Sequence, residues 1–196
     1  MINIDIYLSK IVMAKYQMLN LYVRKKSSIS RNFNKIIWFL FGKPLLASFI
    51  PGTYWRKILL KIFGAKIGLG GKIKSRLFIS EPWNLEVGDH CWFGEDLWID
   101  NLSMVYIGDR VCLSQGVYIC TGNHNYRKET FDLELKNIII EDDCWIAAKS
   151  IIAPGTIMKR GSVASLGSLI SGNIEEYGIY KGNPAKLFKK RNDKFN

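Results

Sequence analysis

The histidine in residues 121–126 (TGNHNY) is the side chain of this chain best suited to chemistry. An imidazole has an ordinary pKa of about 6.5, so it can accept or donate a proton near neutral pH. His124 stands where a regular pattern is interrupted, a pattern in which an apolar residue recurs at every sixth position. The pattern runs through Ile107, Leu113 and Ile119 before it and resumes after a polar gap. We therefore take His124 as the candidate for proton transfer.

The six-residue period predicts a repeat architecture, because it is neither the 3.6 of a helix nor the 2 of a strand. Each hexapeptide is expected to form a short strand and a turn, and three hexapeptides one triangular coil of a parallel β-helix. Glycines that follow the apolar positions, such as Gly88 and Gly108, are expected at tight corners. Because such coils cannot bury all their apolar surface alone, we expect association along their flat faces. The apolar positions are Ile67, Ile73, Ile79, Val87, Phe93, Ile99, Ile107, Leu113, Ile119, Ile140, Ile146, Ile152, Met158, Ala164 and Ile170.

Residues 1–63 lack this period and are predicted to be a helical extension. Helices are expected over residues 4–23 and again over residues 54–63. Gly42, Lys43 and Pro44 are expected to break the apolar run between them, so that neither piece reaches the roughly 20 residues of a membrane span. This basic, aromatic extension has two interpretations. It lies on an anionic membrane surface, or its helices pack on the repeat domain or on a neighbouring subunit.

The charge and the cysteines narrow the class of protein. The chain has 28 Lys and Arg against 17 Asp and Glu, a net charge of +11, which favours polyanionic partners. The basic residues are dense at both ends, which argues against one helix that reads nucleic acid. No CxxC spacing suggests a metal, and Cys91 and Cys144 occupy a slot that otherwise takes small residues, so we expect reduced cysteines in the core. With no signal peptide, the sequence predicts a cytoplasmic protein.

Five motifs resemble the left-handed β-helix acyltransferases with hexapeptide repeats, over about residues 40–191. Within that family the chain is most similar to the colanic acid biosynthesis branch, a relative of the maltose, galactoside and nodulation acetyltransferases. The motifs are FGAKIG (63–68), PWNLEVGD (82–89), SQGVYICTGNHNY (114–126), WIAAKSIIAPG (145–155) and YKGNPAK (180–186).

The resemblance implies an all-β protein, a left-handed parallel β-helix over residues 64–196. It also implies a projecting loop at 122–137, a cofactor-closing segment at 177–196 and a short C-terminal helix. The activity it implies is O-acetyl transfer from acetyl-CoA, without a metal, to a sugar or a precursor of a surface polysaccharide. The implied assembly is a homotrimer with sites between subunits.

The same resemblance assigns His124 as the general base that takes the proton of the attacking hydroxyl and returns it to the CoA thiolate. Many members have an acidic residue directly after this histidine, where this chain has Asn125. The orienting group is therefore left open between Glu129, Asp132 and a backbone carbonyl. The second histidine, His90, falls three residues after a repeat position and is expected on the surface.

The resemblance also implies two sets of binding residues. For the cofactor these are Trp145, Ala147, Ala148, Ser165, Gly167, Lys186 and Arg191. For the acceptor they are Asp96, Asp100, Asn101 and Tyr126, each with an ordinary structural role in a corner or loop as the alternative. Two other functions stay open, an N-acetyltransferase acting on an amino sugar or amino acid and a non-catalytic trimeric scaffold. A three-histidine zinc enzyme of the same fold is disfavoured because the chain has two histidines.

Overall fold

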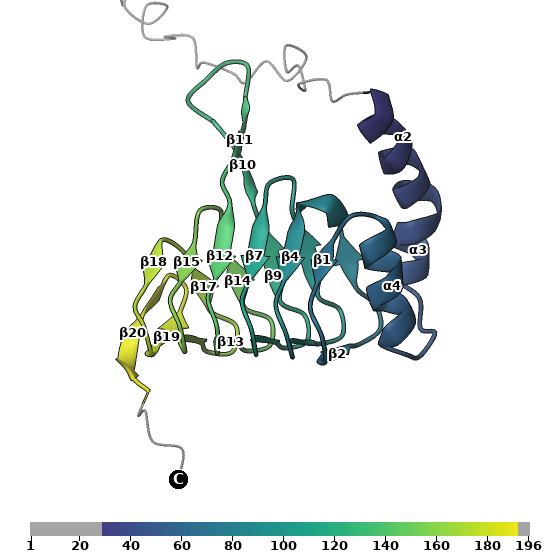
Figure 1. The fold of residues 1–196 in the computed structure, drawn as a ribbon. Helices are drawn as coiled ribbons and strands as arrows, with labels where there is room; N and C mark the ends of the chain where they lie inside the picture. Colours follow the sequence, from purple (N-terminus) through teal and green to yellow (C-terminus); the bar gives the residue numbers. More distant parts are fainter. Residues whose placement is uncertain (1–28, 192–196) are drawn as a thin grey trace, which may run out of the picture. The chain divides into compact units, whose positions relative to one another are not determined.

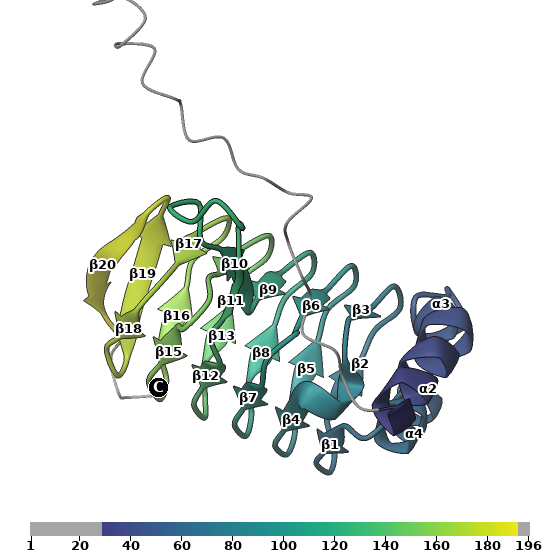
Figure 2. The ribbon, with the colours of Figure 1, turned by 90° about the horizontal axis from the view of Figure 1, so that it is seen from above.

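Short strands repeat from Lys66 onward, and each pairs with the strands of the coils before and after it. The computed structural model describes residues 29–191, in which these strands form three parallel sheets wound into a β-helix (Figures 1 and 2). The first sheet contains β1 (Lys66–Ile67), β4 (Leu85–Val87), β7 (Val105–Ile107), β12 (Ile138–Ile140), β15 (Ile157–Met158) and β18 (Asn173–Ile174). The second contains β2 (Lys72–Ile73), β5 (Trp92–Phe93), β8 (Cys112–Leu113), β13 (Trp145–Ile146), β16 (Val163–Ala164), β19 (Gly178–Gly182) and β20 (Ala185–Lys190). The third contains β3 (Phe78–Ile79), β6 (Trp98–Asp100), β9 (Tyr118–Cys120), β14 (Ile151–Ile152) and β17 (Leu169–Ile170).

The predicted apolar positions form the core of this β-helix. All of them are buried, and none exposes more than the 8% of Ile67. In the first sheet they lie in direct register from coil to coil, in the order Ile67, Val87, Ile107, Ile140, Met158 and Ile174. The six-residue period is therefore confirmed as the stacking period of a parallel β-helix.

The slot for small residues is also buried. Ser150 and Thr156 are fully buried, and each donates its hydroxyl to a backbone carbonyl, of Ser165 at 2.9 Å and of Ala153 at 2.7 Å. The four cysteines are free. Burial raises the pKa of the thiols of Cys91 and Cys144, which keeps both protonated at neutral pH. Their prediction as small core residues is confirmed.

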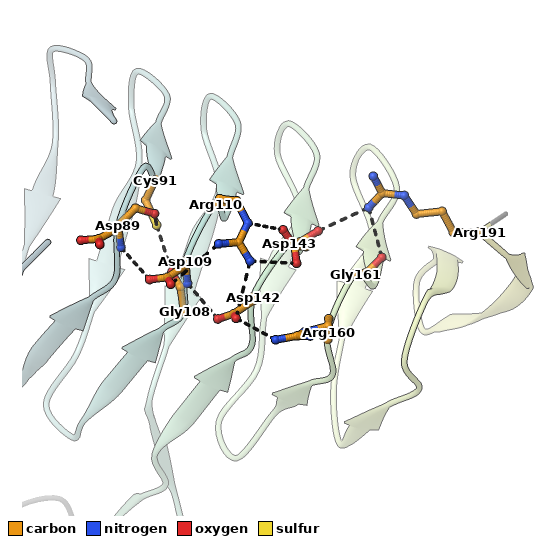
Figure 3. Close-up of polar contacts among 10 residues, drawn as sticks. All are labelled: Asp89, Cys91, Gly108, Asp109, Arg110, Asp142, Asp143, Arg160, Gly161 and Arg191. Carbon is orange, nitrogen blue, oxygen red and sulfur yellow. Dashed lines mark hydrogen bonds and ion pairs between the residues drawn. The ribbon is translucent and has the colours of Figure 1, made fainter. Parts of the chain in front are cut away.

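One corner of the β-helix is held by a ladder of aspartates (Figure 3). The backbone N–H of Asp89 donates to Oδ1 of Asp109 at 2.7 Å, and that of Asp109 donates to Oδ1 of Asp142 at 2.9 Å. A Cβ at Gly88 would lie 2.2 Å from Asp109, and one at Gly108 would lie 2.4 Å from Asp142. These glycines therefore permit close approach between coils. The left-handed backbone we expected of them falls two residues later instead, at His90 and Arg110 among others.

Helices cover the end of the β-helix beside β1 (Figures 1 and 2). They are α2 (Ile29–Ile37), the π-helical η2 (Trp38–Gly42), α3 (Lys43–Leu46) and α4 (Tyr54–Ile62), and a 3₁₀ turn, η3 (Pro82–Asn84), follows β3. The helix over 54–63 is thus confirmed, whereas the one over 4–23 lies outside the described residues. Trp38 is buried and donates its indole N–H to the carbonyl of Ile79 at 3.1 Å. No helix among the described residues is long and apolar enough to cross a membrane.

The expected break at Gly42–Pro44 is wrong. Gly42 and Lys43 keep helical backbone angles, and the N–H of Lys43 donates to the carbonyl of Trp38, one residue further back than in an α-helix. The π-turn supplies the irregular hydrogen bonding that a proline in a helix requires.

The short C-terminal helix is also absent from the described residues. Residues up to Lys190 form the antiparallel pair β19 and β20, with Asn183 and Pro184 at the turn. Tyr180 stacks in register on Ala164, so β19 continues the β-helix inward pattern. Gly182 and Pro184 both oppose helix and favour a turn between the strands.

Adjacent isoleucines of β12 test the inward stacking. Ile140 is 1% exposed and Ile139 is 36% exposed. Ile140→Ala should lower the free energy of unfolding by about 2–5 kcal/mol, because it leaves a cavity between coils. The matched Ile139→Ala should cost less than about 1 kcal/mol. Denaturant unfolding followed by circular dichroism measures both, and equal losses would contradict the stacking.

Candidate active site

His124 lies on a hairpin made by β10 (Gly122–His124) and β11 (Leu133–Leu135). Residues 123–134 form a compact unit separate from the rest of the described chain. Within it, Nδ1 of His124 is 2.7 Å from the carbonyl oxygen of Phe131, and the two rings stack with centroids 4.3 Å apart and planes 1° from parallel. Phe131 has φ of +49°, an uncommon backbone conformation that presents this carbonyl. The imidazole is therefore held by both an edge and a face.

This contact determines which nitrogen of His124 is basic. A carbonyl oxygen only accepts, so Nδ1 must carry the hydrogen, and in the neutral ring Nε2 carries the lone pair. Of the three orienting groups left open by the sequence, the geometry thus favours a backbone carbonyl. Asp132 instead pairs with Lys128 at 2.9 Å, and that hydrogen bond holds the pKa of Asp132 below its usual value.

Asn125, which stands where many family members have an acidic residue, braces the hairpin. Its amide Nδ2 donates to Glu134 at 2.8 Å, and its Oδ1 accepts the backbone N–H of Arg127. Tyr126, predicted to contact the acceptor, is 67% exposed beside Arg127. His90 is exposed at a corner, as predicted.

Most of the predicted cofactor residues meet at one groove of about 660 Å³ on the second sheet. The groove is lined by Ser114, Gln115, Trp145, Ala147, Ala148, Val163, Ser165, Leu166, Ile179 and Arg191. Trp145 forms one wall, and its indole N–H donates to Ser114 Oγ at 3.0 Å. Ala147 and Ala148 are buried, so the groove at that point is bounded by small side chains close to the backbone.

Arg191 reaches the groove from the end of β20. Its Nη1 donates to the carbonyls of Asp143 and Gly161, both at 3.3 Å (Figure 3). These two carbonyls belong to consecutive coils of the aspartate corner. Gly167 and Lys186 do not line the groove. Gly167 is exposed at a corner with φ of +67°, and Lys186 pairs with Lys181 across the β19–β20 turn.

Sequence reasoning missed part of this groove. Val163 and Ile179 lie directly beside Trp145 in the register of the second sheet, 18 and 34 residues after it. The coil length would have found Val163, because 18 residues is three hexapeptides. Phe131 and its carbonyl carried no signal in the sequence.

The predicted acceptor residues lie apart from one another. Asp96 is held by Arg76, whose Nη2 is 2.5 Å from its carboxylate. Asp100 accepts a hydrogen bond from the hydroxyl of Ser80 at 2.7 Å on the third sheet. Next to it, Trp98 and Tyr118 have ring centroids 4.9 Å apart. Burial, with Cys120 and Asp100 close by, raises the pKa of Tyr118 far above its usual value, so its hydroxyl stays protonated.

Asn101 is fully buried and bonded to the backbone. Its Oδ1 accepts the N–H of Glu81 at 3.0 Å, and its Nδ2 donates to the carbonyls of Glu81 at 2.7 Å and Asn84 at 3.1 Å. This arrangement is that of the structural corner residue left open as the alternative. Among the described residues, no group of three His, Cys, Asp or Glu side chains is placed to hold a metal ion.

Fold and site together put the chain among the acyltransferases built on a parallel β-helix. No protein-family model matches the chain. The "Putative colanic acid biosynthesis acetyltransferase WcaF" of Escherichia coli K12 is 34% identical over 137 residues, which are 70% of this chain and 75% of that protein. The galactoside O-acetyltransferase of the same organism is 25% identical over 142 residues, 71% of this chain and 70% of that one. The chain belongs to the hexapeptide-repeat acetyltransferase family.

A solved structure shows the same fold. The hexapeptide-repeat acetyltransferase VCA0836 of Vibrio cholerae, in complex with acetyl coenzyme A, superposes with a TM-score of 0.78 at 19% identity. The match covers 90% of this chain and 97% of that one.

The corner role of Asn101 gives a test against its predicted acceptor role. Asn101→Ala should lower the free energy of unfolding by about 1–3 kcal/mol, since it leaves buried backbone groups without partners. The exposed Asn173→Ala serves as control and should stay within about 0.5 kcal/mol of wild type. Unchanged stability combined with a raised KM for the acceptor would instead favour the acceptor role.

Proposed function

We propose that this protein transfers an acetyl group from acetyl-CoA to a hydroxyl of a sugar or of a surface-polysaccharide precursor, with His124 as general base. The observation that carries the proposal is the 2.7 Å contact between Nδ1 of His124 and the carbonyl of Phe131. It makes Nε2 the nitrogen that accepts a proton. The carbonyl also stabilises the Nδ1–H of the imidazolium that forms.

The proton inventory of the reaction follows from that assignment. Nε2 of His124 takes the proton as the acceptor oxygen attacks the thioester carbonyl, and a tetrahedral oxyanion forms. The carbon–sulfur bond then breaks as the carbonyl reforms, and the imidazolium returns the proton to the departing thiolate. The products are the acetyl ester and free CoA. Backbone N–H groups at the coil corners are the proposed donors to the oxyanion.

The groove of the second sheet is the proposed site for CoA. Apolar walls from Trp145, Val163 and Ile179 suit the pantetheine arm, and small residues at Ala147 and Ala148 let that arm approach the backbone. Arg191 supplies a cation at the groove for a phosphate. The acetyl coenzyme A held by VCA0836 supports this choice of donor. Ser165 lines the groove, while Gly167 and Lys186 stay predicted contacts from outside it.

The proposed acceptor is a sugar. Names of relatives support this class, because they refer to colanic acid, galactosides and lipopolysaccharide. Asp100 is the acceptor residue best supported, since aromatic side chains suited to stacking on a sugar ring lie next to it at Trp98 and Tyr118. Asp96 and Tyr126 stay predictions for the same role.

We also propose a homotrimer with sites between subunits, in the cytoplasm. Support comes from the outward side of the third sheet, where Phe78, Trp98 and Ile151 expose 37%, 48% and 39% of their surface. These residues lie in register on β3, β6 and β14, so they form an apolar stripe along a flat face. A neighbouring subunit packed there would bury that stripe.

Substitution of each histidine tests the general base. His124→Ala should lower kcat by about 10² to 10⁴-fold, the usual size of a general-base effect. His90→Ala is the control and should keep wild-type turnover because His90 is an exposed corner residue. Thiol release from acetyl-CoA, followed with a panel of sugars and nucleotide sugars, measures both. Wild-type turnover in His124→Ala would reject the assignment.

Two tryptophans of the second sheet test the cofactor groove. Trp145→Ala should raise the KM for acetyl-CoA about tenfold or more with a smaller effect on kcat, because it removes an apolar wall of the groove. Trp92→Ala is the matched control, since Trp92 is 53% exposed on the same sheet but does not line the groove. A KM that rises equally in both variants would argue against CoA binding in this groove.

A further inference from the structure

The helices at the end of the β-helix are apolar on two sides. Along the continuous helix from α2 to α3, the buried residues Trp38, Gly42 and Leu46 follow one another at intervals of four. On the opposite side, Phe33 and Leu40 are 64% and 56% exposed. A helix that is apolar all round is expected only where both sides are covered. The β-helix covers one side, and among the described residues nothing covers the other.

The next helix, α4, has the same arrangement. Arg56 and Leu60 are buried against the β-helix side, whereas Tyr54, Ile58 and Ile62 expose 79%, 41% and 72%. The exposed three are spaced by four residues, so they lie along one face of the helix. We call these two faces the outer stripes: Phe33, Ile36 and Leu40 on the first helix, and Tyr54, Ile58 and Ile62 on α4.

The turn between the two helices adds to this surface. Phe49 and Ile50 are 73% and 52% exposed. Such a concentration of large exposed apolar side chains marks an interaction surface. Figures 1 and 2 both put α2, α3 and α4 together at the same end of the β-helix, so stripes and turn belong to one end of the molecule.

The charge at this end is of one sign. Between Asp5 and Glu81 the sequence contains no acidic residue. The helices and their connections over residues 29–63 carry six cations, namely Arg31, Lys35, Lys43, Arg56, Lys57 and Lys61. Lys61, which is exposed, follows the outer stripe residue Ile58 by three positions, and Lys43 follows Leu40 by three. Cations beside an apolar helix face are the pattern of a helix that lies in the headgroup region of an anionic bilayer.

We propose that the outer stripes and the turn at Phe49 and Ile50 dock this protein on the anionic surface of a lipid bilayer. A second copy of the same end is a poorer occupant, because it would bring cations against cations with no carboxylate on the helices to offset them. A bilayer satisfies both features, with acyl chains for the apolar side chains and lipid phosphates for the lysines. The proposal does not depend on the transfer chemistry of the site.

Flotation of the full chain with liposomes tests this surface. The wild-type protein should bind vesicles of phosphatidylcholine mixed with phosphatidylglycerol and bind pure phosphatidylcholine weakly. Leu40→Gln/Ile62→Gln should weaken binding to the mixed vesicles about tenfold or more, because two buried apolar side chains are lost. Leu135→Gln/Leu187→Gln makes the same kind of change at exposed sites elsewhere and should bind like wild type. Lys43→Gln/Lys61→Gln should weaken binding to the anionic vesicles alone.

Three results would overturn the proposal. The first is a wild-type protein that does not float with anionic vesicles. The second is unchanged binding by Leu40→Gln/Ile62→Gln, which would assign membrane contact to another part of the chain. The third is a change in oligomeric state for this variant in analytical ultracentrifugation, which would make the outer stripes a subunit interface. Thiol release with a water-soluble acceptor, measured in parallel, separates any of these results from a failure of the proposed activity.

Discussion

The register between coils is the constraint on which the rest of this structure depends. Each inward residue lies directly over its counterpart one coil away, and that stacking is the hydrophobic core. Because strands are only two or three residues long, no single coil has an interior of its own. The coil between Ile107 and Ile140 spans 33 residues instead of 18 or 20 and still pairs in register. An insertion is tolerated provided that the strands on both sides of it return to the same stack.

Outward positions inherit the same order. When the inward residues stack, the residues beside them also align, so Trp145, Val163 and Ile179 form one wall of a groove although they are far apart in sequence. The corner aspartates align for the same reason, and their ladder holds the coils whose carbonyls accept Arg191. A repeating core thus creates a binding surface without any residue devoted to shaping it.

The site histidine illustrates a different principle. Its basicity is controlled by the backbone carbonyl of Phe131, which any residue type would supply. What this contact requires is the left-handed conformation at that position and the ring stacked on the imidazole. Asn125 therefore fits the family fold without an acidic group, because the amide braces the hairpin and the orienting role belongs to the backbone.

The sequence alone determined the parallel β-helix, because one apolar residue in six is a periodic signal that only stacked coils satisfy. It also singled out His124, the buried cysteines and most residues of the groove, since these followed from motifs or from the period. Tertiary structure decided what depends on contacts between distant residues. Asn101 became a buried corner amide because Glu81 and Asn84 lie one coil away, and Gly88 permits close approach because Asp109 lies beside it. The π-turn at Gly42, the C-terminal hairpin and the exposed outer stripes likewise depend on which face of each segment the β-helix covers, and no local pattern records that choice.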